Sequence, residues 1–172
     1  MNFNLQKSIE ILDRTPDVVR TMISGLSDEW INANEGTDTW SPYDVVAHYI
    51  HCEETDWVPR MNIILSDGSD KKFKPFDSSG HDGNKGRSLT QLLNHFSTIR
   101  QKNVEYLKSK DLSDDQLQLK GIHPKFGEVT LAQLLSTWTV HDLNHISQIA
   151  RVMAKQYKDE VGPWIEFLRI LK

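Results

Sequence analysis

Apolar residues recur every three to four positions in four long segments of the chain, the spacing that places side chains on one face of an α-helix. The first segment runs from Leu5 to Leu26. Pro16 lies inside it, and a proline removes a helical hydrogen bond and clashes with the preceding turn. We therefore expect the first helix to kink or to divide at Pro16.

The second segment has a clear beginning. Ser41 can cap free backbone N–H groups, Pro42 suits the first helical position, and Asp44 lies at the positive end of the helix dipole. One face of this helix then consists of Val45, His48, Cys52 and Thr55. Pro59 is expected to bend the helix before it ends.

Capping boxes open the two remaining long helices. Ser88 and Gln91 begin the third, and Thr130 and Gln133 begin the fourth, which is expected to run to about residue 156. The inward stripe of the fourth helix consists of Leu131, Leu134, Leu135, Trp138, His141, Asp142, His145, Ile149 and Val152. Four amphipathic helices of this kind predict an all-α four-helix bundle.

The connecting segments add to this expectation. Residues 66–87 are rich in Gly, Asp, Ser and Lys, which predicts a long loop of the kind that is often functional. Residues 123–130 predict a turn and one extended step. Residues 162–171 are apolar after a Gly-Pro break and predict a short C-terminal helical segment packed across the bundle. No linker divides the chain, so residues 1–172 are expected to form a single domain.

Composition narrows the class of protein. The net charge is −4, the pI is about 6.0, and acidic and basic residues are interleaved, which argues against nucleic-acid binding. The single cysteine, Cys52, excludes an internal disulfide. No apolar run approaches the roughly 20 residues of a membrane span, and the N-terminus lacks the signal-peptide pattern. We expect a cytoplasmic protein with no membrane partner.

Three histidines interrupt the apolar faces of two helices. His141 and His145 stand four residues apart on the fourth helix, so that their imidazoles project from neighbouring turns of one face. His48 similarly continues the face of the second helix. Inward histidines on facing helices are able to share a metal ion, but each is equally explained as a hydrogen-bonded core residue. The spacing alone leaves both interpretations open.

Residues near these histidines are further candidates. Asp142 or Asn144 can orient an imidazole through its second nitrogen, and Glu53 can supply a carboxylate. Cys52 follows His48 by one helical turn, where it is either a small core residue or a reactive thiolate beside a metal. Trp138 precedes the histidine pair by one turn and can form a wall of the site.

Several segments resemble one known family. WSPYDVVAH (40–48) followed by the pair Glu53 and Glu54, together with TLAQLLSTWTVHDLNHISQIARVM (130–153), are similar to signature segments of the DinB/YfiT-like family of metal-dependent enzymes. Segments 14–26, 123–130 and 162–171 extend the resemblance to nearly the whole chain. It implies an up-down-down-up four-helix bundle, and it implies that a divalent metal ion is held by His48, His141 and His145.

The resemblance also implies a function. Three protein ligands leave a metal position open, and an open site activates a water or thiol nucleophile. We expect a bacterial metal-dependent hydrolase or thiol S-transferase with a small-molecule substrate or a low-molecular-weight thiol, and with Glu53 as general base. Zinc or nickel is the expected metal, with manganese or iron as alternatives. The family further suggests a homodimer.

Two other functions remain open at this stage. The first is a non-catalytic metal- or ligand-binding stress-response protein, which keeps the three histidines but needs no positioned base. The second is a structural bundle whose histidines serve packing alone. Retained metal separates the first from the second, and turnover separates the enzyme from both.

Overall fold

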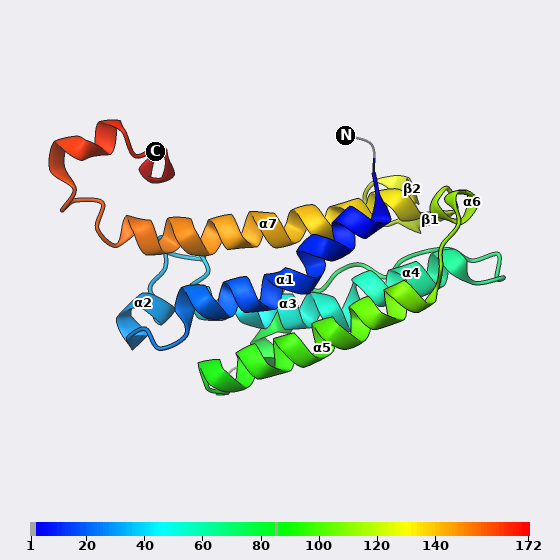
Figure 1. Cartoon of the computed structure of the whole chain (residues 1–172), viewed down its shortest axis with the longest axis horizontal. Helices are drawn as coiled ribbons and strands as arrows, with labels where there is room; N and C mark the ends of the chain where they lie inside the picture. The colour runs from blue at the N-terminus through cyan, green and yellow to red at the C-terminus, as the bar shows by residue number, and fades with distance from the viewer. Residues whose placement is uncertain (1–2, 85) are drawn as a thin grey trace.

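The computed structural model describes residues 3–84 and 86–172. Within these residues, four long helical segments form a bundle: α1 (Leu5–Ile23), α3 (Pro42–Thr55) continued by α4 (Trp57–Leu65), α5 (Leu89–Ser109) and α7 (Leu131–Lys155). Helices α1 and α7 run in one direction and α3–α4 and α5 in the other, so the order is up-down-down-up (Figure 1). The predicted four-helix bundle is confirmed.

The predicted capping boxes begin the long helices. Ser41 accepts a hydrogen bond from the backbone N–H of Asp44, and the Asp44 carboxylate accepts one from the backbone N–H of Ser41. The same reciprocal bonds open α5 at Ser88 and α7 at Thr130. Each box satisfies backbone N–H groups that have no partner inside the helix. These starting points are therefore determined by contacts within three residues.

Pro16 does not divide the first helix. It is buried inside the continuous helix α1, which bends near its middle (Figure 1). A proline at position 16 leaves the carbonyl of Leu12 without its helical N–H partner. That carbonyl accepts a hydrogen bond of 3.0 Å from Nη1 of Arg100 on α5. The tertiary structure thus satisfies the carbonyl group that Pro16 leaves unpaired.

The second helix breaks before Pro59 and not at it. Helix α3 ends at Thr55 and α4 begins at Trp57. A proline ring clashes with the carbonyl four residues earlier, which belongs here to Thr55. Pro59 consequently lies in the first turn of α4, where its missing N–H is not needed. The break places Asp56 and Trp57 at the junction of the two helices.

A short hairpin replaces the single extended step expected over 123–130. Strand β1 (Lys120–His123) pairs antiparallel with β2 (Gly127–Thr130), and α6 (Asp114–Leu117) precedes them. The long 66–87 connection returns from α4 to α5 and lies against this hairpin, because the N–H of Phe73 donates to the carbonyl of Ile122. It also contains the 3₁₀ turn η1 (Gly80–Asn84).

The C-terminal tail forms two 3₁₀ turns, η2 (Gly162–Glu166) and η3 (Arg169–Leu171), which is the short helical segment expected. Leu171 is buried, but Trp164 and Phe167 are 69% and 74% exposed. The tail therefore packs less completely than a helix lying across the bundle would. Of the described helices, none is long and apolar enough to cross a membrane. The remaining short helix, α2 (Asp28–Asn32), precedes α3.

Two groups of buried apolar side chains fill the bundle, one containing Trp138 and the other containing Tyr49 and Phe96. The Arg100 guanidinium joins them, since it lies 5.0 Å from the ring centre of Phe96 and 5.3 Å from that of Trp138. Arg100 is only 1% exposed. A buried charge of this kind requires paired anions, which here are the carboxylates of Glu53 and Asp142. Asp142 directly follows His141 in the sequence.

Candidate metal centre

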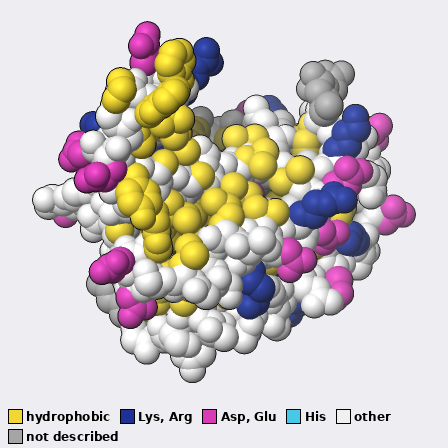
Figure 2. Space-filling model, turned by 60° about the vertical axis from the view of Figure 1, so that its left-hand side comes forward, with side chains coloured by type: hydrophobic (Ala, Val, Ile, Leu, Met, Phe, Trp, Pro, Cys, Tyr) yellow, Lys and Arg dark blue, Asp and Glu magenta, His cyan; other side chains and the backbone are white. Residues whose placement is uncertain are grey.

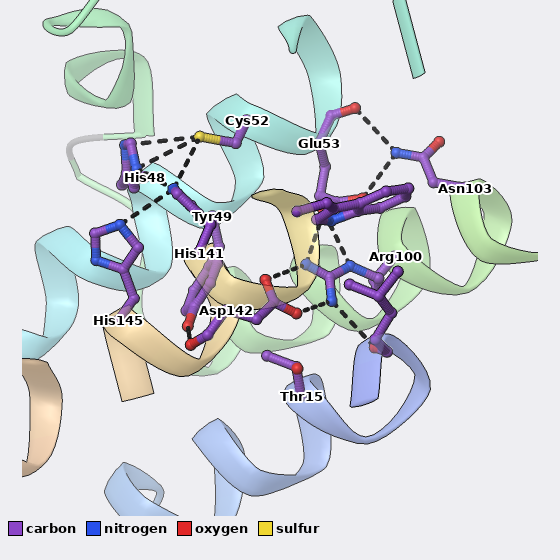
Figure 3. Close-up of polar contacts among 12 residues, drawn as sticks. Thr15, His48, Tyr49, Cys52, Glu53, Arg100, Asn103, His141, Asp142 and His145 are labelled. Atoms are coloured by element: carbon purple, nitrogen blue, oxygen red, sulfur yellow. Dashed lines mark hydrogen bonds and ion pairs between the residues drawn. The ribbon is translucent and has the colours of Figure 1, made fainter. Parts of the chain in front are cut away.

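The three predicted histidines meet inside the bundle. His48 on α3 and His141 and His145 on α7 turn toward one another (Figure 3). The Nε2 atoms of His48 and His141 are 3.0 Å apart, and those of His141 and His145 are 3.1 Å apart. The residues that make up this cluster thus come from segments 93 positions apart in the chain.

Burial favours the neutral form of two of these imidazoles, those of His141 and His145. Burial lowers the pKa of His141 to about 2, and the neighbouring His145, His48 and Arg100 lower it further. Burial also lowers the pKa of His145, against a smaller opposing effect of its hydrogen bond to Gln148. Metal ions bind neutral imidazole, so these two side chains are in the protonation state that a cation needs at neutral pH.

The hydrogen-bond partner of His145 determines which of its nitrogens faces the cluster. Its Nδ1 lies 2.6 Å from Oε1 of Gln148, and an amide oxygen only accepts, so we assign the proton to Nδ1. The Nε2 lone pair of His145 then points toward His141. Metal-binding histidines typically have this arrangement, with the second nitrogen donating to an oxygen.

His141 cannot satisfy its polar atoms within the described part of the chain. Its Nε2 faces the Nε2 atoms of both His48 and His145. A ring nitrogen carries either one proton or one lone pair, so this Nε2 can form a hydrogen bond with only one of the two. Its Nδ1 is buried and has no hydrogen-bond partner among the described residues. A cation between the nitrogens would use the lone pairs that the protein leaves facing one another. The donor set therefore fits a divalent metal ion.

Cys52 lies in the same cluster. Its Sγ is 3.4 Å from Nε2 of His48 and 3.9 Å from Nε2 of His141. In the described residues, the potential ligand atoms of His48, Cys52 and His141 all lie within 4.8 Å of one another. Burial raises the pKa of the Cys52 thiol, with the nearby carboxylates of Asp56 and Glu53 as smaller causes. The cluster consequently contains sulfur as well as nitrogen donors.

Glu53, the expected general base, belongs to a different cluster. Its Oε1 accepts from Nε of Arg100 at 2.9 Å and from Nε1 of Trp138 at 3.0 Å, and its Oε2 accepts from Asn103 at 2.9 Å. Arg100 also forms a two-pronged ion pair with Asp142. Burial raises the pKa of Glu53, while Arg100 opposes that rise. Both oxygens of Glu53 are bound, and Glu53 does not line the cavity beside the histidines.

The remaining candidates are placed by other contacts. Asp142 pairs with Arg100, so its carboxylate is engaged away from the imidazoles. Asn144 is exposed, and Trp138 is fully buried without lining the cavity. These positions follow from long-range pairing that helical spacing does not reveal.

A cavity of about 410 Å³ opens beside the histidine cluster. Its wall is rich in aromatic side chains and comes from α3 and the residue just before Ser41, from α4, the 66–87 segment, the hairpin and α7. The aromatic side chains that line it are Trp40, Trp57, Phe73, Phe76 and Phe126. Trp57 is 3% exposed, and its Nε1 is buried with no hydrogen-bond partner in the described chain. Sequence reasoning did not find these residues, because no local spacing brings them together.

A sequence profile of the DinB superfamily matches residues 11–149, which include all three histidines. The chain belongs to the DinB superfamily. A search of curated protein sequences found no significant match. Among solved structures, YfiT from Bacillus subtilis, described as "a probable metal-dependent hydrolase with an unusual four-helix bundle topology", has a TM-score of 0.74 at 17% identity. The alignment covers 88% of this chain and 87% of that one.

These similarities show different things about the chain. The likeness to YfiT, at 17% identity, shows the DinB-type bundle fold. The superfamily match includes both the His48 segment and the His141–His145 segment. Fold alone does not determine chemistry, because one fold can carry several sites. The function is therefore argued from the geometry of the cluster and the cavity.

Proposed function

We propose that this DinB-superfamily protein is a metal-dependent enzyme that activates a water or thiol nucleophile and acts on a small molecule. The observation that carries the proposal is the meeting of three imidazoles, His48, His141 and His145, at the wall of an aromatic cavity. The nitrogens that face one another suit a cation, and the adjoining cavity suits a substrate, so the two would lie next to each other. Zinc or nickel suits this nitrogen-rich set best.

Each residue has a defined part in this proposal. A divalent metal ion held by the three imidazoles would polarise a nucleophile bound to it. Gln148 fixes the ring of His145 with its Nε2 directed inward. Glu53 serves as a positioning residue, because both of its oxygens are hydrogen-bonded, to Arg100 and Trp138 at Oε1 and to Asn103 at Oε2. Water exclusion comes from the aromatic side chains around the cavity.

The cavity indicates the chemical class of the substrate. Its aromatic wall favours an apolar or planar body of small-molecule size. The buried Trp57 N–H, which has no partner in the described chain, is available to donate to an oxygen of that substrate. Asp56 and Arg60 form a buried ion pair at the same wall. A substrate with an apolar body and one hydrogen-bond acceptor, such as an ester, an amide or an electrophile for thiol transfer, fits this lining.

Metal content and turnover test the proposal together. Untagged protein should contain close to one equivalent of zinc or nickel by mass spectrometry, and alanine at His48, His141 or His145 should lower that content. Metal-loaded protein should then turn over one class among apolar esters, apolar amides and electrophiles offered with a small thiol. Absence of metal after reloading would overturn the proposal. Metal retention without turnover in any class would favour a non-catalytic metal- or ligand-binding stress-response protein.

We also propose that two copies of the chain pair through an apolar surface. Hydrophobic side chains gather on the tail and the neighbouring face of the bundle (Figure 2). The exposed apolar residues of α7 and the tail include Val140, Leu143, Trp164, Phe167 and Ile170. Light scattering should give about twice the 19.8 kDa chain mass, and the double variant Trp164→Asp, Phe167→Asp should be monomeric. A monomeric wild-type protein would exclude this pairing.

A further inference from the structure

Cys52 occupies an unusual position for a core cysteine. It follows His48 by one turn of α3, is 2% exposed, and also packs in the apolar core with Trp138. Its sulfur, however, is directed at the cluster of imidazoles and lines the cavity (Figure 3). A cysteine that only filled space would not need its sulfur aligned with two Nε2 atoms of a candidate metal site.

The distances within the cluster match a mixed nitrogen and sulfur site. Zinc bonds of about 2.05 Å to imidazole and 2.3 Å to thiolate, at a tetrahedral angle, separate two nitrogens by about 3.3 Å and a nitrogen and a sulfur by about 3.6 Å. The nitrogen pairs lie at 3.0 and 3.1 Å. The sulfur lies at 3.4 Å from Nε2 of His48 and 3.9 Å from that of His141. The observed distances are thus close to those of a zinc site for both the nitrogen and the sulfur donors.

The sulfur belongs to a group of three potential ligand atoms from different residues. The atoms of His48, Cys52 and His141 lie within 4.8 Å of one another, whereas His145 reaches this group through its 3.1 Å contact with His141. We propose that Cys52 is a fourth protein ligand of the metal ion, so that the site has three nitrogen donors and one sulfur donor. This inference rests on the proposed function, because it assumes that the histidine cluster holds a metal ion.

The proposal has consequences for the chemistry of the site. When the sulfur binds, its S–H bond breaks, the proton passes to bulk water, and the thiolate electron pair forms the bond to the metal. A thiolate donor favours zinc over manganese, because soft sulfur selects softer metals. Four protein ligands also close a tetrahedral site. The nucleophile would then enter only as a fifth ligand or when Cys52 leaves.

Cobalt(II) substitution tests the sulfur ligand directly. Cobalt bound to a thiolate absorbs in the near-ultraviolet through charge transfer from sulfur, and cobalt bound only to imidazole lacks this band. Cys52 is the single cysteine of the chain, so in untagged protein without added thiols the band has one possible source. Wild-type protein should bind one equivalent of cobalt and show the band. Cys52→Ser and Cys52→Ala should bind cobalt without it.

The variants also have a binding readout. Loss of a ligand should weaken zinc binding by at least the roughly 10–100-fold that loss of a supporting group typically costs, with a smaller change for manganese. His145→Ala is the matched control, because it removes a nitrogen donor and should keep the sulfur band in whatever cobalt it binds. Circular dichroism and urea unfolding of the metal-free proteins verify that each variant is folded.

The outcomes separate this inference from the proposed function. One equivalent of cobalt in the wild type without the sulfur band would overturn the role of Cys52 and leave the three-histidine site intact. The same holds if Cys52→Ser and Cys52→Ala keep the wild-type spectrum and zinc affinity. A wild-type protein that binds no cobalt, zinc or nickel would overturn the metal site itself. A band lost only in the cysteine variants supports the fourth ligand.

Discussion

Two polar clusters lie side by side in the interior of this bundle, and they differ in how their atoms are satisfied. Around Arg100, every strong donor and acceptor finds a protein partner: Glu53, Asp142, Asn103, Trp138 and the carbonyl of residue 12. In the histidine cluster, nitrogens of the same kind face one another. The polar atoms of the first cluster are paired within the protein, whereas in the second the buried Nδ1 of His141 lacks a partner among the described residues.

The comparison distinguishes a structural polar site from a functional one by chemistry alone. Both clusters are largely buried, both contain residues of α3 and α7, and His141 and Asp142 are adjacent in sequence. Burial therefore does not separate them. Buried polar groups are normally hydrogen-bonded, so atoms that lack a partner point to a ligand. The predictions below break one cluster at a time, from the largest expected effect to the smallest.

Substitution of Arg100 should have the largest effect on stability. Arg100→Met would leave the carboxylates of Glu53 and Asp142 buried without a counter-charge, and it would free the carbonyl of Leu12 beside Pro16. Breaking a buried ion pair by removing one partner costs about 3–5 kcal/mol. Urea unfolding of the metal-free protein measures this loss. A loss below about 1 kcal/mol would show that the network does not stabilise the bundle.

Substitution of His141 should separate metal binding from stability. His141→Ala removes a ring whose buried Nδ1 has no hydrogen-bond partner in the described chain. Removing that unpaired nitrogen lowers the free energy of the folded state and offsets part of the lost packing. We expect the metal-free protein to lose about 1 kcal/mol or less, while metal content falls to near zero. Mass spectrometry and urea unfolding on the same preparation give both values. A loss of stability as large as that of Arg100→Met would place His141 with the structural cluster.

Acid should destabilise the metal-free protein through the histidines. The folded pKa values of His141 and His145 lie below the ordinary value near 6.5, so below that pH the unfolded chain binds more protons than the folded one. The stability present above pH 6.5 is therefore lost as the pH falls toward the folded pKa values. Between pH 7.5 and 5.5 we expect a loss of about 1–2 kcal/mol.

Urea unfolding at the two pH values measures this slope, with zinc removed by a chelator. His141→Ala should show a shallower slope than the wild type, because one of the two lowered pKa values is gone. Arg100 variants should be less stable at both pH values but should show the same change in the free energy of unfolding between them, because His141 and His145 are still present. An unchanged slope in His141→Ala would show that the imidazole is not held neutral by burial.

The Trp57 side chain provides the smallest and most local test. Trp57→Phe removes the buried N–H that lacks a partner but keeps an aromatic ring beside Trp138. If the N–H binds substrate oxygen, KM should rise about 5- to 10-fold, with little change in kcat and in metal content. Trp40→Phe is the matched control on the same cavity wall. An unchanged KM in Trp57→Phe would exclude Trp57 as a substrate contact.

The fold was largely predictable because its signals are local. The capping boxes at Ser41, Ser88 and Thr130 depend on contacts across three residues, and they begin the helices where expected. The behaviour of Pro16 was not predictable in this way. Whether a proline ends a helix depends on a partner for the freed carbonyl, and Arg100, which supplies it, lies 88 residues away from Leu12.

The site was predictable only in part. Helical spacing and family resemblance brought forward His48, His141 and His145, and the structure brings their Nε2 atoms together. Glu53 was predicted as the general base, but it is hydrogen-bonded to Arg100 and Asn103 in the cluster around Arg100. Glu53 and the histidines differ in whether their polar atoms have hydrogen-bond partners within the protein. Spacing indicates which face a side chain occupies, and it says nothing about the atoms that it will meet.

By itself, the sequence determined the four amphipathic helices, their beginnings and the inward face of each histidine. Periodicity and capping act over three or four residues and need no other part of the chain. Only the tertiary structure decided which buried polar groups have hydrogen-bond partners and which lack them. It also brought together the aromatic side chains of the cavity wall and placed the sulfur of Cys52 beside the imidazoles. Those outcomes depend on atoms from distant segments meeting within hydrogen-bond or metal-bond distance.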